Sequence, residues 1–239
     1  MELLVVVSII AVLLAVLLPT LSVARQRAMC VACLSNLRQL GTAAQEYTQA
    51  YAGSFPPAYY GAGWHDAWDF KLIAGPAGTT AVIPGILWMG ETNLRIQQCP
   101  AYHGRSGTAT DPFTGYNYNT SYIGHGADEL HPASANVNQL VRPAACALFG
   151  DGGFGALTNK YMRAPLLLNP VPPNGDGVPD AERAAGAQAY RHEGNTNVCY
   201  CDGHVESVST RFDATGPTVI TLPAADGFLS ADNSAYDGY

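Results

Sequence analysis

Cysteines form the most conspicuous group of side chains in this sequence that could bind a metal, react or cross-link. They are Cys30, Cys33, Cys99, Cys146, Cys199 and Cys201. Cys30 and Cys33 form a CxxC pair, but redox-active pairs of this kind open a helix, and this pair lies inside a predicted one. Leu34 follows, which excludes CxxCH haem attachment. A zinc site would need a second CxxC pair, and Cys199 and Cys201 have CxC spacing instead. The spacing therefore argues against zinc and against haem.

Disulfides are the alternative for these cysteines. An even number of cysteines favours disulfide bonds in a chain that leaves the cytosol, although spacing does not give the connectivity. Cys146 is predicted on a strand next to the one that carries Cys199 and Cys201, so it could join either of them. Cys30 would take a remaining partner. We therefore expect disulfides that tie the N-terminal helix to the rest of the chain.

The segment RHEGNTNVCYCDGHVESV contains a histidine and an aspartate that a folded hairpin could bring together. Asp202 and Gly203 lie between two strand-like stretches and predict a two-residue type I′ turn, because Gly203 can adopt positive φ. In that register Cys201 faces His204. His192, just before the first strand, could then form a hydrogen bond or ion pair with Asp202.

Two interpretations of this histidine are open. The favoured one is a structural latch, in which His192 and Asp202 hold the hairpin on the sheet. The other is a metal or ligand site built from His192, Asp202, His204 and Asp151. No motif completes a catalytic metal set, since HExxH is absent.

The stretch PPNGDGVPDAE is similar to the centre of an acidic calcium loop. Asn174, Asp176 and Asp180 offer oxygen ligands at alternate positions, with a glycine at the sharp turn. Pro172 replaces the usual first aspartate, and Arg183 stands where the last glutamate would be. The remaining ligands are too few for tight binding, so a plain surface turn is the alternative. Calcium is the only cofactor that the sequence suggests.

Composition and motifs argue against two broad classes of function. The chain has 12 Lys and Arg against 19 Asp and Glu, without the basic face of a nucleic-acid-binding protein. It also lacks a phosphate loop and a GxSxG elbow. We therefore expect neither nucleic-acid binding nor an enzyme.

A long N-terminal helix must position Cys30 and Cys33. From Leu3 to Leu18 the one non-apolar residue is Ser8, and this run is somewhat shorter than the roughly 20 residues of a membrane span. Beyond Pro19, where we expect a kink, apolar residues recur at helical spacing. They are Cys30, Cys33, Leu34, Leu37, Leu40, Ala44, Tyr47 and Tyr51.

The sequence therefore predicts three parts: an apolar membrane or filament-core helix (1–23), an amphipathic helix (24–52) and a β-rich globular head (53–239). In the head, short strand-like stretches alternate with Gly, Pro, Asn and Asp clusters. We predict an α+β fold, with an antiparallel sheet packed on the helix and two further helices at 64–75 and 180–191. The acidic tail 212–239 is expected to be solvated or to lie on a filament surface.

The stretch ELLVVVSIIAVLLAVLLPTLSVAR resembles the N-terminus of type IV pilins and pseudopilins. In that family a prepilin peptidase cleaves after a glycine and the new N-terminal residue is methylated. A glutamate precedes a proline there by the spacing that separates Glu2 from Pro19. The leader, the glycine and the first mature residues of the family pattern are absent from this sequence.

His192, the nine residues after it, and Asp202-Gly203 match an H-X9-DG motif. The motif is found near the C-terminus of a large group of bacterial pilin-like proteins that share this N-terminus. The stretches CLSNLRQLGTAAQEYTQAYAGSFPP, YNYNTSY and RPAACALFGDGG resemble the same group. Positions Cys33 and Cys99 recur in it, and this resemblance makes a Cys33–Cys99 disulfide the first expectation.

The resemblance implies a structural subunit of an extracellular, type IV pilus-like filament. Its helix would lie in the inner membrane first and then, handled by the prepilin peptidase and the assembly machinery, in a filament core of identical subunits. There Glu2 would pair with the N-terminal amine of a neighbour, which makes a carboxylate in an apolar environment tolerable.

Two alternatives remain open. One is a minor pilin, or a pseudopilin of a secretion system, whose head binds a surface or a polysaccharide through an aromatic cleft formed by Trp64, Trp68 and Trp88. The other is an exported enzyme anchored by the pilin-like helix.

Overall fold

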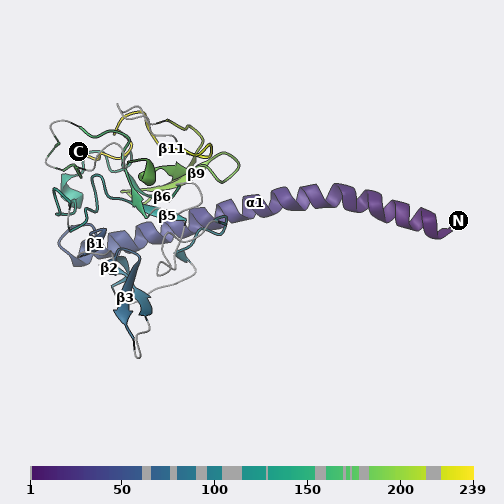
Figure 1. Cartoon of the computed structure of the whole chain (residues 1–239), viewed down its shortest axis with the longest axis horizontal. Coiled ribbons are helices and arrows are strands. Elements are labelled where there is room, and N and C mark those ends of the chain that lie inside the picture. Colours follow the sequence, from purple (N-terminus) through teal and green to yellow (C-terminus); the bar gives the residue numbers. More distant parts are fainter. Residues whose placement is uncertain are drawn as a thin grey trace.

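One long helix and a β-rich head make up the computed structural model of this chain, in which the N-terminal half of the helix projects away from the head (Figure 1). The structure describes residues 2–60, 66–75, 80–89, 96–103, 115–127, 129–153, 160–168, 171–172, 174–177, 183–213 and 222–239. The predicted α+β fold is confirmed: a long N-terminal helix precedes a domain of mainly antiparallel sheets.

Helix α1 (Glu2–Ala50) runs without interruption through Pro19, and Figure 1 shows a gently curved rod. Its 49 residues correspond to roughly 74 Å at 1.5 Å per residue. Proline leaves a backbone carbonyl of the preceding turn without its usual donor. That carbonyl belongs to Ala15, and beside it the Thr20 hydroxyl donates to the carbonyls of Val16 and Leu17 at 3.3 and 2.8 Å. The helix continues through the proline.

The second half of α1 packs on the head through one face. Its buried positions include Cys33, Leu37, Leu40, Ala44 and Tyr47, which alternate in spacing between four and three residues and so form a single stripe. The predicted amphipathic stripe is confirmed at these positions. The helix ends where Ala52 and then Gly53 adopt positive φ, a common way to terminate a helix.

The central sheet lies against this stripe. Its order is β10-β9-β6-β5-β7, and α1 contacts β9, β10 and β6. Neighbouring strands are antiparallel except β5 and β7, which are parallel. The strands are β5 (Tyr116–Asn119), β6 (Ala147–Asp151), β7 (Tyr161–Met162), β9 (Thr196–Tyr200) and β10 (Val205–Val208).

Two smaller sheets and three short 3-10 helices complete the described part of the head. One sheet has the order β1-β2-β3-β4 and the other pairs β11 with β8. Their strands are β1 (Tyr59–Tyr60), β2 (Asp66–Ala67), β3 (Phe70–Ala74), β4 (Thr80–Pro84), β8 (Gln188–Ala189) and β11 (Asp226–Gly227). The 3-10 helices are η2 (Ile86–Trp88), η4 (Val137–Gln139) and η5 (Ala184–Gly186).

The main hydrophobic core lies between α1 and the central sheet and is rich in aromatic rings. Trp68, Tyr118 and Phe149 are buried, and their ring centroids lie 4.9–5.8 Å apart. The buried polar ends of two of these rings are satisfied: Trp68 Nε1 donates to the Lys160 carbonyl at 3.2 Å and the Tyr118 hydroxyl to the Pro56 carbonyl at 2.7 Å.

Three sequence predictions for the head are wrong. The segment predicted as a helix at 64–75 forms β2 and β3 in its described part. In the described part of 180–191, Arg183 is helical and is followed by the short η5 and then by strand β8, so the predicted helix does not extend to 191. The tail is not a solvated segment either. Phe228 and Tyr236 are fully buried in a second hydrophobic core of the head, which also contains Met162 and Val198. The apolar and aromatic residues of the tail therefore outweigh its aspartates.

Candidate functional site

The free half of α1 is the first candidate site, and we call the segment 3–23 the stem. Every residue of the stem is exposed, including fifteen Val, Leu and Ile side chains that are 43–78% exposed. The helix is long and apolar enough to cross a membrane, and its most apolar window has no buried residue. Membrane anchors and signal sequences share this property. Glu2 is exposed at the head of the stem and Pro19 near its end.

The second candidate site is a buried cluster where α1 enters the head, which we call the Cys/Asp/His cluster: Cys33, Cys99, Asp151 and His192. Cys33 is on α1, Cys99 on the segment 96–103, Asp151 at the end of β6, and His192 just before β9. All four residues are buried. Their potential ligand atoms all lie within 4.8 Å of one another. Four segments that are distant in the sequence therefore meet at one point.

The atoms of this cluster are in direct contact. The Cys33 thiol donates to Asp151 Oδ1 at 3.1 Å. His192 Nε2 lies 3.3 Å from Asp151 Oδ2 and 3.7 Å from Cys99 Sγ. Sulfur, nitrogen and oxygen donors of this kind are those that bind zinc and related metals. Among the described residues this is the group that could hold a metal ion.

Burial and hydrogen bonding shift the pKa values in the cluster strongly. Burial raises the pKa of Cys33 well above its usual value. Hydrogen bonds with Cys33 and with His192 lower the pKa of Cys99 to about 6. Burial disfavours charge on His192, but its hydrogen bonds with Asp151 and Cys99 raise its pKa to about 10. Burial likewise opposes charge on Asp151, and its contacts with His192 and Arg191 still lower its pKa.

A surrounding layer of polar groups orients the cluster. The Asn197 backbone N–H donates to Asp151 Oδ2 at 2.8 Å. The Tyr116 hydroxyl hydrogen-bonds to Cys33 and accepts from Asn36 Nδ2 at 3.2 Å. The Arg191 guanidinium donates to the carbonyls of Gly115, at 3.3 Å, and Gly152.

The arrangement does not match a Cys-His-Asp catalytic relay. In such a relay the nucleophile and the acid lie on opposite nitrogens of the imidazole. Here both Cys99 Sγ and Asp151 Oδ2 lie against Nε2 of His192. Cys99 is also buried, which restricts the approach of a substrate. The geometry therefore does not support nucleophilic catalysis at this cysteine.

The predicted contact between His192 and Asp202 is wrong. His192 contacts Asp151 and Cys99, whereas Asp202 Oδ1 lies 2.6 Å from the His204 ring. The alternative ligand set is therefore divided between two places: His192 and Asp151 are in the cluster, and Asp202 and His204 lie at the surface.

The predicted type I′ turn at Asp202-Gly203 is also wrong. Tyr200 pairs with His204 through its backbone and its ring, so three residues form the loop, with Gly203 at φ 90°. A three-residue loop that ends in a left-handed glycine is the common alternative to the two-residue turn. His204 is therefore paired with Tyr200 and not, as predicted, with Cys201, a shift of one position.

The loop of this hairpin docks on α1. Gln45 Nε2 donates to the Asp202 carbonyl at 3.1 Å, and a Cβ on Gly203 would approach Gln45 Nε2 to 2.5 Å. Both ends of the H-X9-DG motif therefore lie near α1: His192 is linked to Cys33 through Asp151, and the loop at Asp202 accepts directly from Gln45.

The remaining cysteines lie in separate surroundings. All six cysteines are free thiols in this structure. Cys146 hydrogen-bonds with Cys201, one of its two predicted neighbours. Cys30 contacts Asn197, whereas Cys199 packs against Gly41, eleven positions further along α1. The structure therefore does not bring Cys30 to Cys199. Disulfides between Cys33 and Cys99 and between Cys146 and Cys201 stay predictions.

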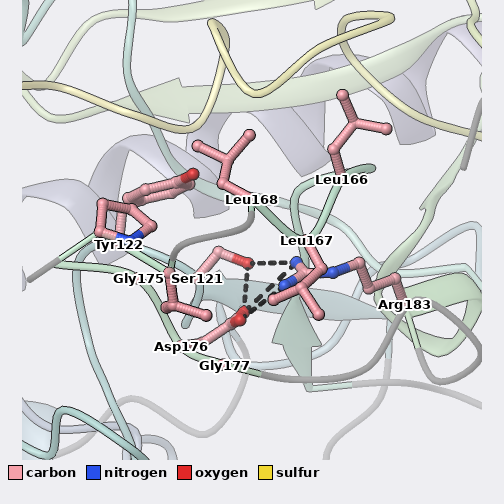
Figure 2. Close-up of a pocket in the computed structure, with 11 residues that line it drawn as sticks. Ser121, Tyr122, Leu166, Leu167, Leu168, Gly175, Asp176, Gly177 and Arg183 are labelled. Carbon is pink, nitrogen blue, oxygen red and sulfur yellow. Dashed lines mark hydrogen bonds and ion pairs between the residues drawn. The ribbon is translucent and has the colours of Figure 1, made fainter.

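The predicted calcium loop places its central aspartate among cations. Asp176 is buried and accepts from Ser121 at 2.6 Å, Arg183 at 2.7 Å and Arg163 at 3.1 Å. Figure 2 shows the serine and the Arg183 guanidinium directed at the carboxylate, beside a cavity of about 10 Å³. That volume holds at most one water.

The other two predicted calcium ligands do not complete a site. Asn174 contacts Asp237 at 3.5 Å, and Asp180 lies outside the described residues. Because guanidinium groups surround Asp176 where a cation would approach, the structure argues against this carboxylate as a calcium ligand.

The aromatic cleft proposed for a polysaccharide-binding head is not formed by the tryptophans that the structure describes. Trp68 is buried in the main core, and Trp88 is partly buried against it. Trp64 lies outside the described residues. These tryptophans therefore serve packing.

Comparisons with protein-family profiles, with curated proteins and with solved structures found no match.

Proposed function

We propose that this chain is a structural subunit of an extracellular filament of the type IV pilus kind. The stem anchors it in the inner membrane first and then packs against the stems of identical subunits. The observation that carries the proposal is the exposure of fifteen large aliphatic side chains on 3–23. An apolar surface of this extent is unfavourable in water and is expected to be buried against lipid or protein.

The distribution of apolar residues restricts what that cover can be. A helix that lies flat on a membrane surface has one charged face, but from Leu3 to Val23 the stem has no charged residue on any side. It must therefore be surrounded, either by lipid or by several other helices. A filament subunit experiences both environments in turn.

Glu2 has a specific role in this proposal. A carboxylate in an apolar environment is tolerated when a cation neutralises it, and the exposed position of Glu2 leaves it accessible to a neighbour. An amine of an adjacent subunit would fix the axial offset between two stems. Pro19 shapes the rod without separating its halves, since the helix continues through it.

The test is assembly in cells with two matched glutamate variants. Glu2→Gln removes the charge that precedes the stem, and Glu46→Gln removes an exposed charge from the half of α1 that packs on the head. We expect sheared surface fractions to contain filaments of this chain, seen by electron microscopy and identified by mass spectrometry, in the wild type and Glu46→Gln. Glu2→Gln should reduce the filament yield at least tenfold while the subunit stays in the membrane fraction.

Normal filaments from Glu2→Gln would refute the role of this glutamate. A wild-type chain recovered from cells as a dispersed, soluble monomer with its stem intact would refute the filament proposal itself.

A further inference from the structure

We propose that Cys33, Cys99, Asp151 and His192 form a structural zinc site that fastens α1 to the head. The site is independent of filament assembly. It rests on the donor atoms of four side chains, on their separations and on the charge and hydrogen bonds around them.

The separations of the donor atoms fit one tetrahedral ion. Zinc binds sulfur at about 2.3 Å and nitrogen or oxygen at about 2.0–2.2 Å, so tetrahedral donors lie roughly 3.3–3.8 Å apart. The contacts between Asp151 and His192 and between Cys99 and His192 measure 3.3 and 3.7 Å. The 3.1 Å contact of Cys33 is with the other carboxylate oxygen, Oδ1, and one donor atom from each of the four residues lies within 4.8 Å of the other three. Small outward movements would admit the ion.

The histidine supplies the most specific argument. Its Nε2 atom faces a sulfur and a carboxylate oxygen at once. One ring nitrogen cannot donate well to two acceptors, but as a zinc ligand it would direct one lone pair to an ion between them. A tight turn precedes β9 and fixes this ring: His192 and Asn195 exchange backbone hydrogen bonds, and Glu193 and Gly194 both have positive φ.

Charge around the site also suits a divalent cation. Two thiolates and one carboxylate together carry three negative charges, and a zinc ion neutralises two of them. Arg191, which lies close enough to interact with Asp151 and Cys99, balances the third. The complete site would therefore be neutral. A buried site without net charge avoids the large cost of an unpaired ion.

Second-layer hydrogen bonds resemble those of metal sites. Metal ligands are commonly held by groups that bond to their other atoms. The Asn197 N–H fixes Asp151, and Tyr116, itself held by Asn36, fixes Cys33. An open pocket of about 340 Å³ includes His192 and Arg191 in its lining, which gives an ion a path to the ligands.

The position of the proposed site on α1 indicates what a bound ion would do. Cys33 is the first buried residue of α1, at the N-terminal end of the stripe that packs on the head. Four protein ligands without an open position are typical of structural zinc. A site there would transmit a load on the stem to β6 and to the strand that follows His192.

The experiment uses the full-length chain in detergent micelles under reducing conditions, with Zn²⁺ or Co²⁺ as the only added metal. We expect about one zinc per chain by elemental mass spectrometry. Cobalt should give a tetrahedral absorption spectrum with sulfur-to-metal charge-transfer bands. In Cys99→Ala the zinc content should fall at least tenfold, and the charge-transfer intensity per bound cobalt should halve.

Two further variants make the test specific. Cys146→Ala removes a buried cysteine outside the cluster and should retain one zinc per chain. Tyr116→Phe keeps the ring but loses the hydrogen bond to Cys33, so it should fold and bind zinc about tenfold more weakly. It gives a result even if Cys99→Ala fails to fold.

Three results would overturn the site. One is wild-type protein that takes up no stoichiometric zinc or cobalt. The second is equal metal content in a folded Cys99→Ala. The third is a Cys33–Cys99 disulfide, found by non-reducing peptide mapping of metal-free protein isolated from cells. None of these results depends on whether filaments form.

Discussion

The two halves of α1 belong to one continuous helix, yet they have opposite surroundings. In the stem every residue is exposed, and in the other half a stripe from Cys33 to Thr48 is buried under the central sheet. The buried half is stabilised by its own chain. No described part of the head covers the stem, and in the proposed function lipid or other copies of the chain would do so. Under that proposal, one helix separates residues that fold the protein from residues that would assemble it.

The largest expected effect concerns the stem. Replacing Leu13, Leu14 and Leu17 with Gln removes the burial of three leucines, about 5–9 kcal/mol in total, and adds polar groups that an apolar environment disfavours. We expect the triple variant to be lost from the membrane fraction and from sheared filaments, as followed by fractionation and immunoblotting. The melting temperature of its head should stay within about 2 °C of the wild type.

The matched control introduces the same residue on the exposed face of the packed half. Gln at the exposed positions Ser35 and Thr42 should leave membrane association unchanged. If this control were depleted from the membrane fraction as strongly as the stem variant, the two halves of α1 would not differ in the way proposed.

The next effect concerns folding and compares two leucines in one helix. Leu37 is fully buried and Leu13 is 64% exposed. Leu37→Ala should destabilise the head by about 2–5 kcal/mol, because it removes packed methyl groups and leaves a cavity. Leu13→Ala should leave the unfolding free energy of the head unchanged. Denaturant unfolding in detergent, followed by near-ultraviolet circular dichroism, measures both, and equal losses would contradict the division.

The difference between the halves of α1 is readable in the sequence because each half has a simple pattern. An uninterrupted apolar run predicts a stem, and apolar residues at helical spacing predict the packed stripe. The end of the helix is readable as well, since Gly53 and the prolines at 56 and 57 are stop signals, and Ala52 and Gly53 take positive φ there.

The head is less readable because its central strands are buried on both faces. All four residues of β5 are buried, including Asn117 and Asn119. Asn119 is satisfied by the carbonyls of Ala147 and Tyr236, at 2.7 and 2.9 Å. A pattern of alternating polar and apolar residues cannot reveal such a strand, because long-range hydrogen bonds decide its burial.

Turn chemistry explains why the loop of the hairpin differs from the prediction. An aspartate-glycine pair is a strong signal for a two-residue turn, and Asp202-Gly203 carries it. The structure instead has positive φ at both central residues in Glu193-Gly194, where glutamate is an unusual choice. Sequence reasoning expected His192 to contact Asp202 and therefore missed its contacts with Cys99 and Asp151. The pairing of Cys33 with Cys99 that was expected from the sequence was the available signal.

Alanine variants of two glycines distinguish the energy of docking the loop on α1 from the energy of backbone strain. Gly203 and Gly194 have φ of 90° and 84°, so alanine costs about 1 kcal/mol or somewhat more at either position. A Cβ at Gly203 would also approach Gln45 Nε2 to 2.5 Å, whereas at Gly194 it meets nothing within 4 Å. We expect Gly203→Ala to be the more destabilising by about 1 kcal/mol, because the hydrogen bond from Gln45 is disturbed.

Urea unfolding of these two alanine variants and of Gln45→Ala measures the effect. In a Gln45→Ala background the difference between the two glycine variants should largely vanish. Equal losses for the two glycines in the wild-type background would show that the loop does not depend on its contact with the packed half of α1.

The smallest expected effect separates the loop itself from its docking. Asp202 docks on α1 through its carbonyl, whereas its side chain serves the loop by accepting from the His204 N–H at 3.1 Å and contacting the ring at 2.6 Å. Both groups are solvent-exposed. Asp202→Ala should therefore cost only about 0.2–1 kcal/mol and leave the effect of Gln45→Ala unchanged.

The pH dependence of this small effect has a defined sign. Burial slightly opposes charge on Asp202, but hydrogen bonds with His204 lower its pKa. The contribution is therefore fully present above the usual aspartate pKa of about 4 and is lost as the pH falls through the lower pKa of the folded state. Urea unfolding of wild type and Asp202→Ala should differ at pH 7 and converge near pH 2. A difference that persisted at pH 2 would assign the effect to packing, and Asp202 would then belong with Gly203 to the contact with α1.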